Sequence, residues 1–176
     1  APACIIGDVD RIKRLTPHDR HRCFTRSDFV ARAEAAADNA PVQEHEGEGI
    51  AAQIFTSGTT AAPKAALLRH ANLVSYILGT VEFCSASENE ATLVCVPPYH
   101  IAGIAALLSS IYALRRIVLL PSFDPDTWLA LVSAERVTNA FVVPTMLTRI
   151  IGRMDAGVTA DLSALRAIAP LGFLMK

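Results

Sequence analysis

The sequence predicts an α/β fold in which helices flank a mostly parallel β-sheet. A chain of 176 residues with 52% apolar residues is long enough to bury one core. Residues 91–96 are nearly all apolar, which is typical of a parallel strand that is buried on both faces. After this segment, short apolar stretches alternate with longer helical ones, and such alternation indicates βαβ units.

Local signals define the individual elements. The expected strands span residues 4–6, 50–55, 65–69, 91–96, 117–120, 140–143 and 165–168. The expected helices span residues 27–38, 70–84, 101–114, 125–136 and 145–154, the second beginning at His70 or Asn72. Ser27 and Asp124 are the expected N-caps of the first and fourth helices, and Pro125 suits a first helical position. Residues 8–26 and 43–49 are expected to be loops, so the regular α/β part covers residues 50–169.

Charge and hydropathy exclude several classes of protein. The net charge is −1 and no long basic run is present, so nucleic acid is not an expected partner. The longest apolar segment, residues 101–114, is shorter than the roughly 20 residues that span a bilayer, so it is an expected core helix. Residues 1–7 show no secretory signal, and the expected location is the cytoplasm.

The cysteines give no sign of a disulfide framework. Their positions are Cys4, Cys23, Cys84 and Cys95, without a CxxC pair, and we expect buried thiols in a reducing compartment. His18 and His21 lie close to Cys23, but no second ligand pair occurs elsewhere. A polar loop is the simpler interpretation, and no metal is assigned to these three residues.

Residues 54–66 carry the strongest functional signal, with the order Ile-Phe-Thr-Ser-Gly-Thr-Thr-Ala-Ala-Pro-Lys-Ala-Ala. Hydroxyl and backbone N–H groups can surround phosphate oxygens, Gly58 lets the backbone come close, and Lys64 supplies a positive charge. The Walker pattern GxxxxGK[ST] does not fit, because Pro63 precedes the lysine and Ala65 follows it. The segment predicts a phosphate-binding loop, and a surface turn is the simpler alternative.

The order Thr56-Ser57-Gly58-Thr59-Thr60-x-x-Pro63-Lys64 closely resembles the signature of the acyl-adenylate-forming superfamily. That superfamily includes acyl-CoA synthetases, firefly luciferase and amino-acid adenylation domains. The resemblance implies that the β- and γ-phosphates of ATP are held by Thr56, Ser57, Thr59, Thr60 and Lys64. It also implies that Gly58 permits their approach and that Thr56 faces Mg²⁺. Ala61 and Ala65 stand where the family usually has glycines, and a positive φ at either would cost roughly 1–2 kcal/mol.

A second segment, Cys95-Val-Pro-Pro-Tyr-His-Ile-Ala-Gly103, places His100 just past a parallel strand, where ligands of open α/β sheets bind. Spacing alone favours a histidine that simply begins a helix. The segment resembles the superfamily's proline-aromatic-His-x-x-Gly motif, which implies that His100 and Gly103 line the entrance for the carboxylate substrate. A histidine rather than aspartate there favours a fatty or aromatic acid. Residues 142–147, including Pro144, resemble the apolar segment that walls the acyl pocket.

The resemblance covers residues 50–169 well and residues 1–49 only in general layout. Residues 1–176 are therefore expected to be a single internal fragment of the family's N-terminal AMP-binding domain. The motif that holds adenine and the C-terminal domain with its catalytic lysine do not occur in these residues. In addition, Pro170-Leu171-Gly172-Phe173 replaces an expected double-glycine turn. The fragment alone is expected to give no ATP–pyrophosphate exchange.

The expected parent protein is an acyl-CoA synthetase, a fatty-acid–CoA ligase that joins a carboxylic acid to ATP and then to coenzyme A. The expected ligands are ATP or AMP, Mg²⁺ and coenzyme A. Lys64 and His100 are the expected catalytic residues, and they act by positioning and by charge stabilisation. One alternative is a non-catalytic remnant that associates through exposed sheet edges. Another is an unrelated nucleotide-binding module.

Overall fold

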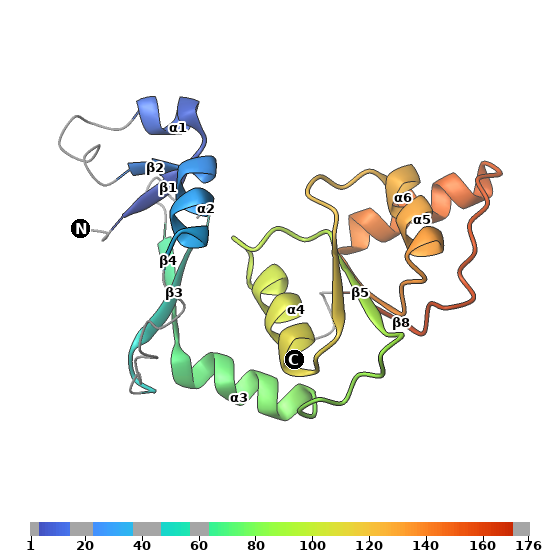
Figure 1. Cartoon of the computed structure of the whole chain (residues 1–176). Coiled ribbons are helices and arrows are strands. Elements are labelled where there is room, and N and C mark those ends of the chain that lie inside the picture. Colours follow the sequence, from blue (N-terminus) through green and yellow to red (C-terminus); the bar gives the residue numbers. More distant parts are fainter. Residues whose placement is uncertain (1–3, 15–22, 37–46, 57–63, 171–176) are drawn as a thin grey trace. The chain divides into compact units, whose positions relative to one another are not determined.

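The computed structural model describes residues 4–14, 23–36, 47–56 and 64–170, the side chains of Thr56 and Pro170 excepted. The chain divides into two compact units, residues 1–44 and residues 45–176 (Figure 1). The second unit contains every sequence-predicted site residue that the structure describes.

The first unit consists of β1 (Ile5–Gly7), α1 (Val9–Lys13), β2 (Cys23–Thr25) and α2 (Arg26–Glu34). β1 and β2 pair in parallel. The expectation of a loop over residues 8–26 was wrong at α1 and β2, because elements of three to five residues are too short to show a periodic pattern. Ser27 is not the N-cap of α2, since the hydroxyl of Thr25 already accepts a hydrogen bond from the Asp28 N–H at 3.1 Å.

The second unit begins with an antiparallel hairpin of β3 (Ile50–Thr56) and β4 (Lys64–Arg69), as the sequence predicts. The helix α3 (His70–Thr80) follows directly, and the His70 N–H donates to the Gly49 carbonyl at 3.0 Å. This bond ties the start of α3 to the start of β3. The helix ends four residues before the predicted Cys84, because Val81 is already extended and Cys84 has a φ of 52°.

Four parallel strands form the main sheet in the order β6-β5-β7-β8. The strands are β5 (Ala91–Val94), β6 (Arg116–Leu119), β7 (Asn139–Val142) and β8 (Ala167–Pro170). The helices between them are α4 (Ile101–Tyr112), α5 (Pro125–Ala134) and α6 (Pro144–Asp155). The predicted parallel sheet with flanking helices is therefore confirmed, with β8 two residues later than expected. Asp124 caps α5 as predicted and accepts from the Thr127 N–H at 2.9 Å.

The strand order decides which helix covers which face. The connection from β5 to β6 runs in one direction along the sheet, and the connection from β6 to β7 runs in the opposite direction. Because both crossovers are right-handed, α4 lies on one face of the sheet and α5 on the other. α6 continues in the direction of α5 and lies on the same face, where the two helices pack together (Figure 1). Side chains alternate along β5, so Leu93 faces α5 and Thr92 faces α4.

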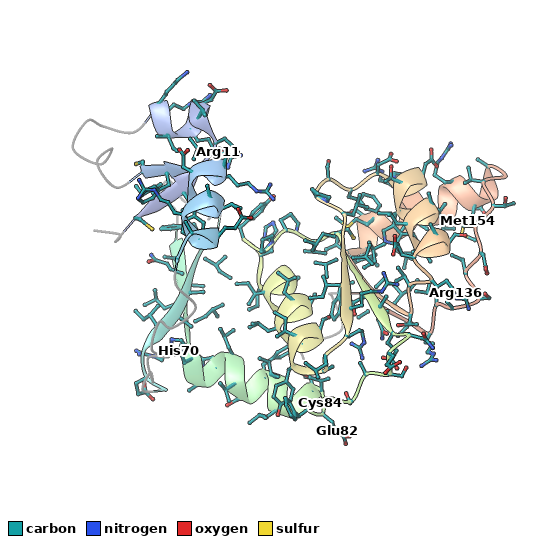
Figure 2. The ribbon with its side chains drawn as sticks, in the orientation of Figure 1. Arg11, His70, Glu82, Cys84, Arg136 and Met154 are labelled. Carbon is teal, nitrogen blue, oxygen red and sulfur yellow. The ribbon has the colours of Figure 1, made fainter. Side chains whose placement is uncertain are left out.

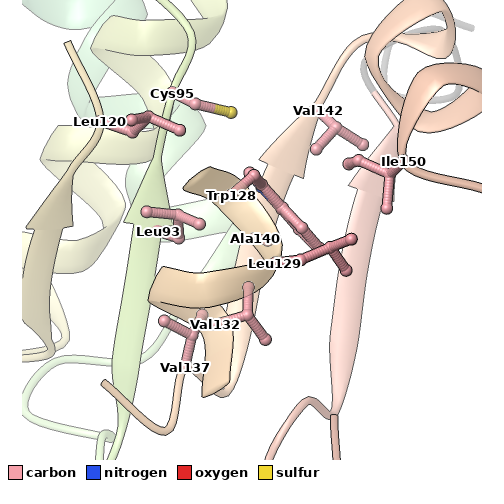
Figure 3. Close-up of a cluster of buried hydrophobic side chains, with 10 residues drawn as sticks. All are labelled: Leu93, Cys95, Leu120, Trp128, Leu129, Val132, Val137, Ala140, Val142 and Ile150. Atoms are coloured by element: carbon pink, nitrogen blue, oxygen red, sulfur yellow. The ribbon is translucent and has the colours of Figure 1, made fainter. Parts of the chain in front are cut away.

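The hydrophobic core lies between the sheet and α5. Trp128, Leu129 and Val132 of α5 are each 1% exposed and form one buried cluster with Leu93 of β5 and Val142 of β7, which Figure 3 shows. Burying side chains of this size stabilises a fold by about 1.5–3 kcal/mol each. On the opposite face the buried residues of α4 are small, which lets that helix lie close to the sheet; they are Ala102, Gly103, Ala106, Ser109 and Ser110.

Within the described residues none of the four cysteines forms a disulfide, and the four differ in exposure. Cys95 is buried, but Cys4 and Cys84 are exposed and Cys23 is half-buried. The expectation of buried thiols was therefore wrong for Cys4 and Cys84. Cys84 has mixed sequence neighbours, Phe83 and Ser85, and it lies in the surface turn after α3, outside any buried element (Figure 2). In the residues that the structure describes, no helix has the length and apolar character that crossing a membrane requires.

Candidate functional site at the carboxyl edge of the sheet

The topology of the sheet points to the edge where β5 and β7 end. These strands are neighbours, but β5 leads onward to β6 on one side while β7 leads to β8 on the other. Ligands of open α/β sheets bind at such a reversal, outside the carboxyl ends of the strands. His100 lies in the segment that follows β5, and Pro144 lies just after β7, at the first position of α6. The structure therefore brings both sequence-predicted residues to the same edge of the sheet.

His100 is the N-cap residue of α4, and its position is fixed by backbone hydrogen bonds. Its N–H donates to the Pro97 carbonyl at 3.0 Å, and its own carbonyl accepts from the Gly103 N–H at 3.0 Å. Its imidazole is exposed and lies beside the ring of Tyr99, with 4.7 Å between the ring centroids. The result is an exposed imidazole on a tightly held turn, at the edge where a ligand is expected.

Gly103 lies where the backbone of this turn leaves no room for a side chain. It is buried, and a Cβ atom there would lie 2.3 Å from the Pro97 carbonyl oxygen and 2.7 Å from that of Val96. Any larger residue would push the first turn of α4 away from the segment that carries His100. The geometry gives Gly103 a packing role, and its contact with a substrate stays a prediction.

Cys95 connects the two strands that flank the candidate site, which the sequence did not reveal. Its thiol donates to the Phe141 carbonyl of β7 at 3.3 Å, and its sulfur lies 4.0 Å from that of Met146 in α6. Burial raises the pKa of the Cys95 thiol to about 11, so the group is a neutral thiol near neutral pH. The expected burial of Cys95 is confirmed, but its bond to Phe141 joins residues 46 positions apart and shows no local signal.

The predicted phosphate loop is bracketed by the end of the hairpin. Thr56 and Lys64 are direct partners across β3 and β4, and the Lys64 side chain is exposed. Such partners have Cβ atoms about 4.5–5.5 Å apart, so the hairpin brings the two ends of the loop together. The predicted phosphate ligands Ser57, Gly58, Thr59 and Thr60, as well as Ala61, lie outside the described residues.

Ala65 can be assessed directly. It pairs with Phe55 inside the hairpin and is not among the described non-glycine residues with positive φ, which are Cys84, Leu114 and Arg136. The left-handed strain considered for this position is therefore excluded. A strand conformation suits alanine as well as glycine, so the methyl group of Ala65 carries no backbone penalty there.

A groove of about 280 Å³ lies on the face of β7 and β8 that α4 leaves uncovered. It is lined by Tyr76 and Thr80 from α3, by Val81 just after that helix, by Ser109 and Arg115, and by Asn139, Ala140, Phe141, Ala167 and Ala169 from the strands. The sequence gave no sign of this groove, because it joins residues that are far apart along the chain. Along the strands it extends from Phe141 and Ala169, one residue before the carboxyl ends, to Asn139 and Ala167 at the amino ends of β7 and β8.

A larger hollow of about 620 Å³ lies at the opposite edge, around the amino ends of the strands. Arginines line it, but Arg116 is bound to Glu135 at 2.6 Å and Arg166 to Glu90 at 3.2 Å. These ion pairs connect strands to each other and to the end of α5.

The position of Mg²⁺ stays a prediction. The side chain of Thr56, the expected ligand, is not described. No group of three or more His, Cys, Asp or Glu side chains within the described ranges could hold a metal ion. Magnesium in nucleotide sites is held largely by phosphate oxygens and water, so the described residues neither supply nor need a full ligand set.

Residues 4–172 match the family described as AMP-binding enzyme. The chain belongs to this family. The resemblance noted in the sequence is thereby confirmed, and the parallel sheet with its flanking helices is that of the AMP-binding enzymes. In solved structures, ATP-bound MatB from Rhodopseudomonas palustris superimposes with a TM-score of 0.77 and 25% identity, over 95% of this chain and 34% of MatB.

Among curated proteins, the feruloyl-CoA synthase of Amycolatopsis sp. is 33% identical over 135 residues, which are 76% of this chain and 27% of that protein. The 2-succinylbenzoate–CoA ligase of Bacillus cytotoxicus is 32% identical over 101 residues, which are 57% of this chain and 21% of that protein. The matched part is thus between about a fifth and a third of the length of these AMP-binding relatives.

Proposed function

We propose that the complete protein containing this sequence is an AMP-forming carboxylic acid–CoA ligase. The observation that carries the proposal is the carboxyl edge of the neighbouring strands β5 and β7, where both His100 and Pro144 lie, in a chain of the AMP-binding family. The curated relatives named above are both CoA ligases, and this supports the choice of coenzyme A as acceptor.

In the first step of the proposed reaction, a carboxylate oxygen of the acid attacks the α-phosphorus of ATP. The new bond is that of an acyl-adenylate, and the bond to pyrophosphate breaks. In the second step the sulfur of coenzyme A attacks the acyl carbon, AMP leaves with the former acid oxygen, and the thiol proton passes to solvent. Both steps need positioning and charge stabilisation more than covalent help from side chains.

The loop between β3 and β4 holds the phosphates in this proposal. Its hydroxyl groups and N–H groups surround the phosphate oxygens, and Lys64 contributes a charge-assisted hydrogen bond. The hairpin supports this role because it fixes Lys64 directly opposite Thr56, so the loop has a rigid base. Thr56 remains the proposed contact to Mg²⁺, and no step is derived through the metal.

The carboxyl edge of the main sheet holds the acid. His100, on its fixed turn, lies at the entrance, Gly103 keeps that turn closed, and Pro144 contributes to the wall. A fatty acid and an aromatic acid are both candidates at this level. We place the reaction in the cytoplasm and regard residues 1–176 as one section of the AMP-binding domain.

A second candidate function is association through the hairpin. Its outer face exposes Phe55 at 66% and Leu67 at 50%, and large apolar side chains on neighbouring strands can pair with another chain. This function does not require nucleotide. Sedimentation of the chain over a range of concentrations, with Phe55→Ser as the variant, tests it.

The test of the proposed ligase is ATP–pyrophosphate exchange by the complete protein with a panel of short, long and aromatic acids, followed by thioester formation with coenzyme A. We expect acid-dependent exchange and a CoA thioester. No exchange with any acid, from protein that melts cooperatively, would contradict the ligase and leave association as the remaining candidate.

A further inference from the structure

Cys95 lies at the point where β5 and β7 separate. The pairing of the two strands ends at Val94 and Phe141, and Cys95 is the next residue along the chain. Beyond this point β5 leads to α4 on one face of the sheet, whereas β7 leads to α6 on the other. The separation of His100 from Pro144 therefore depends on what holds the two strand ends together here.

The side chain of Cys95 spans this junction. It is 4% exposed, and its S–H donates to the carbonyl of Phe141, the last residue of β7 that pairs with β5, at 3.3 Å. Its sulfur also lies 4.0 Å from the sulfur of Met146, in the first turn of α6. In Figure 3 the sulfur points toward the side of the cluster that holds Trp128 and Val142. One atom thus contacts both the end of β7 and the start of α6.

Trp128 of α5 adds a third contact to the same thiol. Its indole N–H is buried and has no hydrogen-bond partner of ordinary geometry in the part of the chain that the structure describes. Burial raises the pKa of the Cys95 thiol, and the indole N–H of Trp128 is among the groups that oppose this rise, so the two side chains lie close together. The sulfur is therefore held by elements on one face of the sheet, α5 and α6, and by β7.

The chain after Cys95 passes any displacement on to His100. Four residues separate the two positions, and one of them, Val96, is 4% exposed. The rings of Pro97 and Pro98 fix their φ angles near about −65°. The Pro97 carbonyl in turn accepts from the His100 N–H at 3.0 Å. A segment with so few free torsions moves as a unit, so the position of its first residue sets the position of the imidazole.

A buried cysteine can also be a small apolar residue that only fills space. In that case a valine, which has a similar size, would replace it without effect. The hydrogen bond to Phe141 distinguishes the two roles, because serine keeps a donor for that carbonyl and valine does not.

We infer that Cys95 is a positioning residue of the proposed ligase site. Its thiol joins the segment that carries His100 to the end of β7 and the start of α6, and it thereby sets the separation of His100 from Pro144. The thiol takes no part in the chemistry. The inference rests on the proposed ligase function and adds to it a residue that holds the acid entrance in shape.

The first test measures ATP–pyrophosphate exchange by the complete protein, with propanoate, cinnamate and dodecanoate as the short, aromatic and long acids. Cys95→Val should lower kcat/KM for the best of these acids about tenfold or more, because a misplacement of about 1 Å can cost a hundredfold in rate. Its KM for ATP should stay within about twofold of the unmodified value, since the phosphate loop belongs to the hairpin. Cys95→Ser should keep kcat/KM for the acid within about threefold.

Val137→Ala is the matched control for lost stability. Val137 is fully buried in the same cluster, but it lies two residues before β7, at the opposite end of that strand from Phe141. Its truncation should lower the melting temperature and leave the ratio of the two KM values unchanged. An equal change of this ratio in Val137→Ala and Cys95→Val would overturn the inference.

The second test needs no catalysis. Spin labels on Ile101→Cys and Thr145→Cys, exposed positions one residue beyond His100 and Pro144, report the separation of the two segments in protein whose other cysteines, apart from Cys95, are serine. We expect the same narrow distance distribution with cysteine or serine at position 95, and a displaced or broader one with valine.

Equal behaviour of Cys95→Val and Cys95→Ser in either measurement would overturn the inference while the ligase function stands. Absence of exchange in the unmodified protein would contradict the ligase function instead. The label distances would then decide by themselves whether Cys95 sets the separation of the two strand ends.

Discussion

The two edges of the main sheet are built in different ways. At the amino edge, charged side chains tie neighbouring strands together: Glu90 binds Arg115 and Arg166, and Arg116 binds Glu135. At the carboxyl edge the chain is held by backbone hydrogen bonds, while the side chains of Tyr99, His100 and Pro144 remain exposed. Side chains that bind a ligand must be left free of internal partners, so the stabilising contacts are concentrated at the opposite edge.

Substitutions at the amino edge should therefore lower the free energy of unfolding. Glu90→Ala would leave Arg115, which is only 15% exposed, without its carboxylate, and we expect a loss of about 3 kcal/mol in the free energy of unfolding. Denaturant unfolding measures this, with the exposed Glu88→Ala as control. Equal denaturant midpoints for Glu90→Ala and Glu88→Ala would contradict the claim that ion pairs stabilise the amino edge.

The same carboxylate gives the amino edge a pH dependence. Burial disfavours the charged form of Glu90, but the hydrogen bond and charge of Arg115, together with Arg166, outweigh it and hold its pKa below the ordinary 4.5. A lowered pKa means that the stabilisation is complete above about 4.5 and is lost as the pH falls through the folded value. Stability of the unmodified chain should thus fall more steeply in acid than that of Glu90→Gln, and parallel curves would contradict this.

The carboxyl edge should respond at Gly103, where a methyl group meets the Pro97 carbonyl. Gly103→Ala is expected to cost about 1–3 kcal/mol, the usual range for overpacking, and to raise KM for the acid more than KM for ATP. Gly152→Ala in α6 is the matched control, because its Cβ meets nothing within 4 Å, and it should be neutral or stabilising by up to about 1 kcal/mol. Two variants of equal stability would show that the turn is not tightly packed.

How far the sequence could predict these regions depends on how local each signal is. The apolar run of β5, the Asp124-Pro125 start of α5 and the strand-loop-strand of the hairpin are read from adjacent residues, and all three occur in the structure. The shared carboxylate Glu90 binds Arg166, 76 positions away, and the groove joins Tyr76 to residues as far along the chain as Ala169, so no local pattern contains them. The exposure of Cys84 was missed for the same reason, since its neighbours in sequence, Phe83 and Ser85, do not reveal whether other parts of the chain cover the turn.

Two buried threonines provide a smaller and sharper test at the amino edge. The hydroxyl of Thr138 accepts from the Ala91 N–H at 3.0 Å, whereas that of Thr92 is buried and has no hydrogen-bond partner among the residues that the structure describes. Thr138→Val should therefore destabilise the fold by about 1–3 kcal/mol, and Thr92→Val should stabilise it by up to about 1 kcal/mol. Thermal unfolding of the two variants measures both changes. Melting temperatures that shift in the same direction would contradict the prediction.

The central claim is that the loop between β3 and β4 holds ATP phosphates through Lys64. Lys64→Ala in the complete protein should lower kcat/KM for ATP in the adenylation half-reaction about ten- to a hundredfold, or 1.5–3 kcal/mol. The melting temperature should stay unchanged, because Lys64 is exposed, and Lys13→Ala, a change in α1, should leave both quantities as they were. A Lys64→Ala variant that melts normally and keeps the full kcat/KM for ATP would contradict the account.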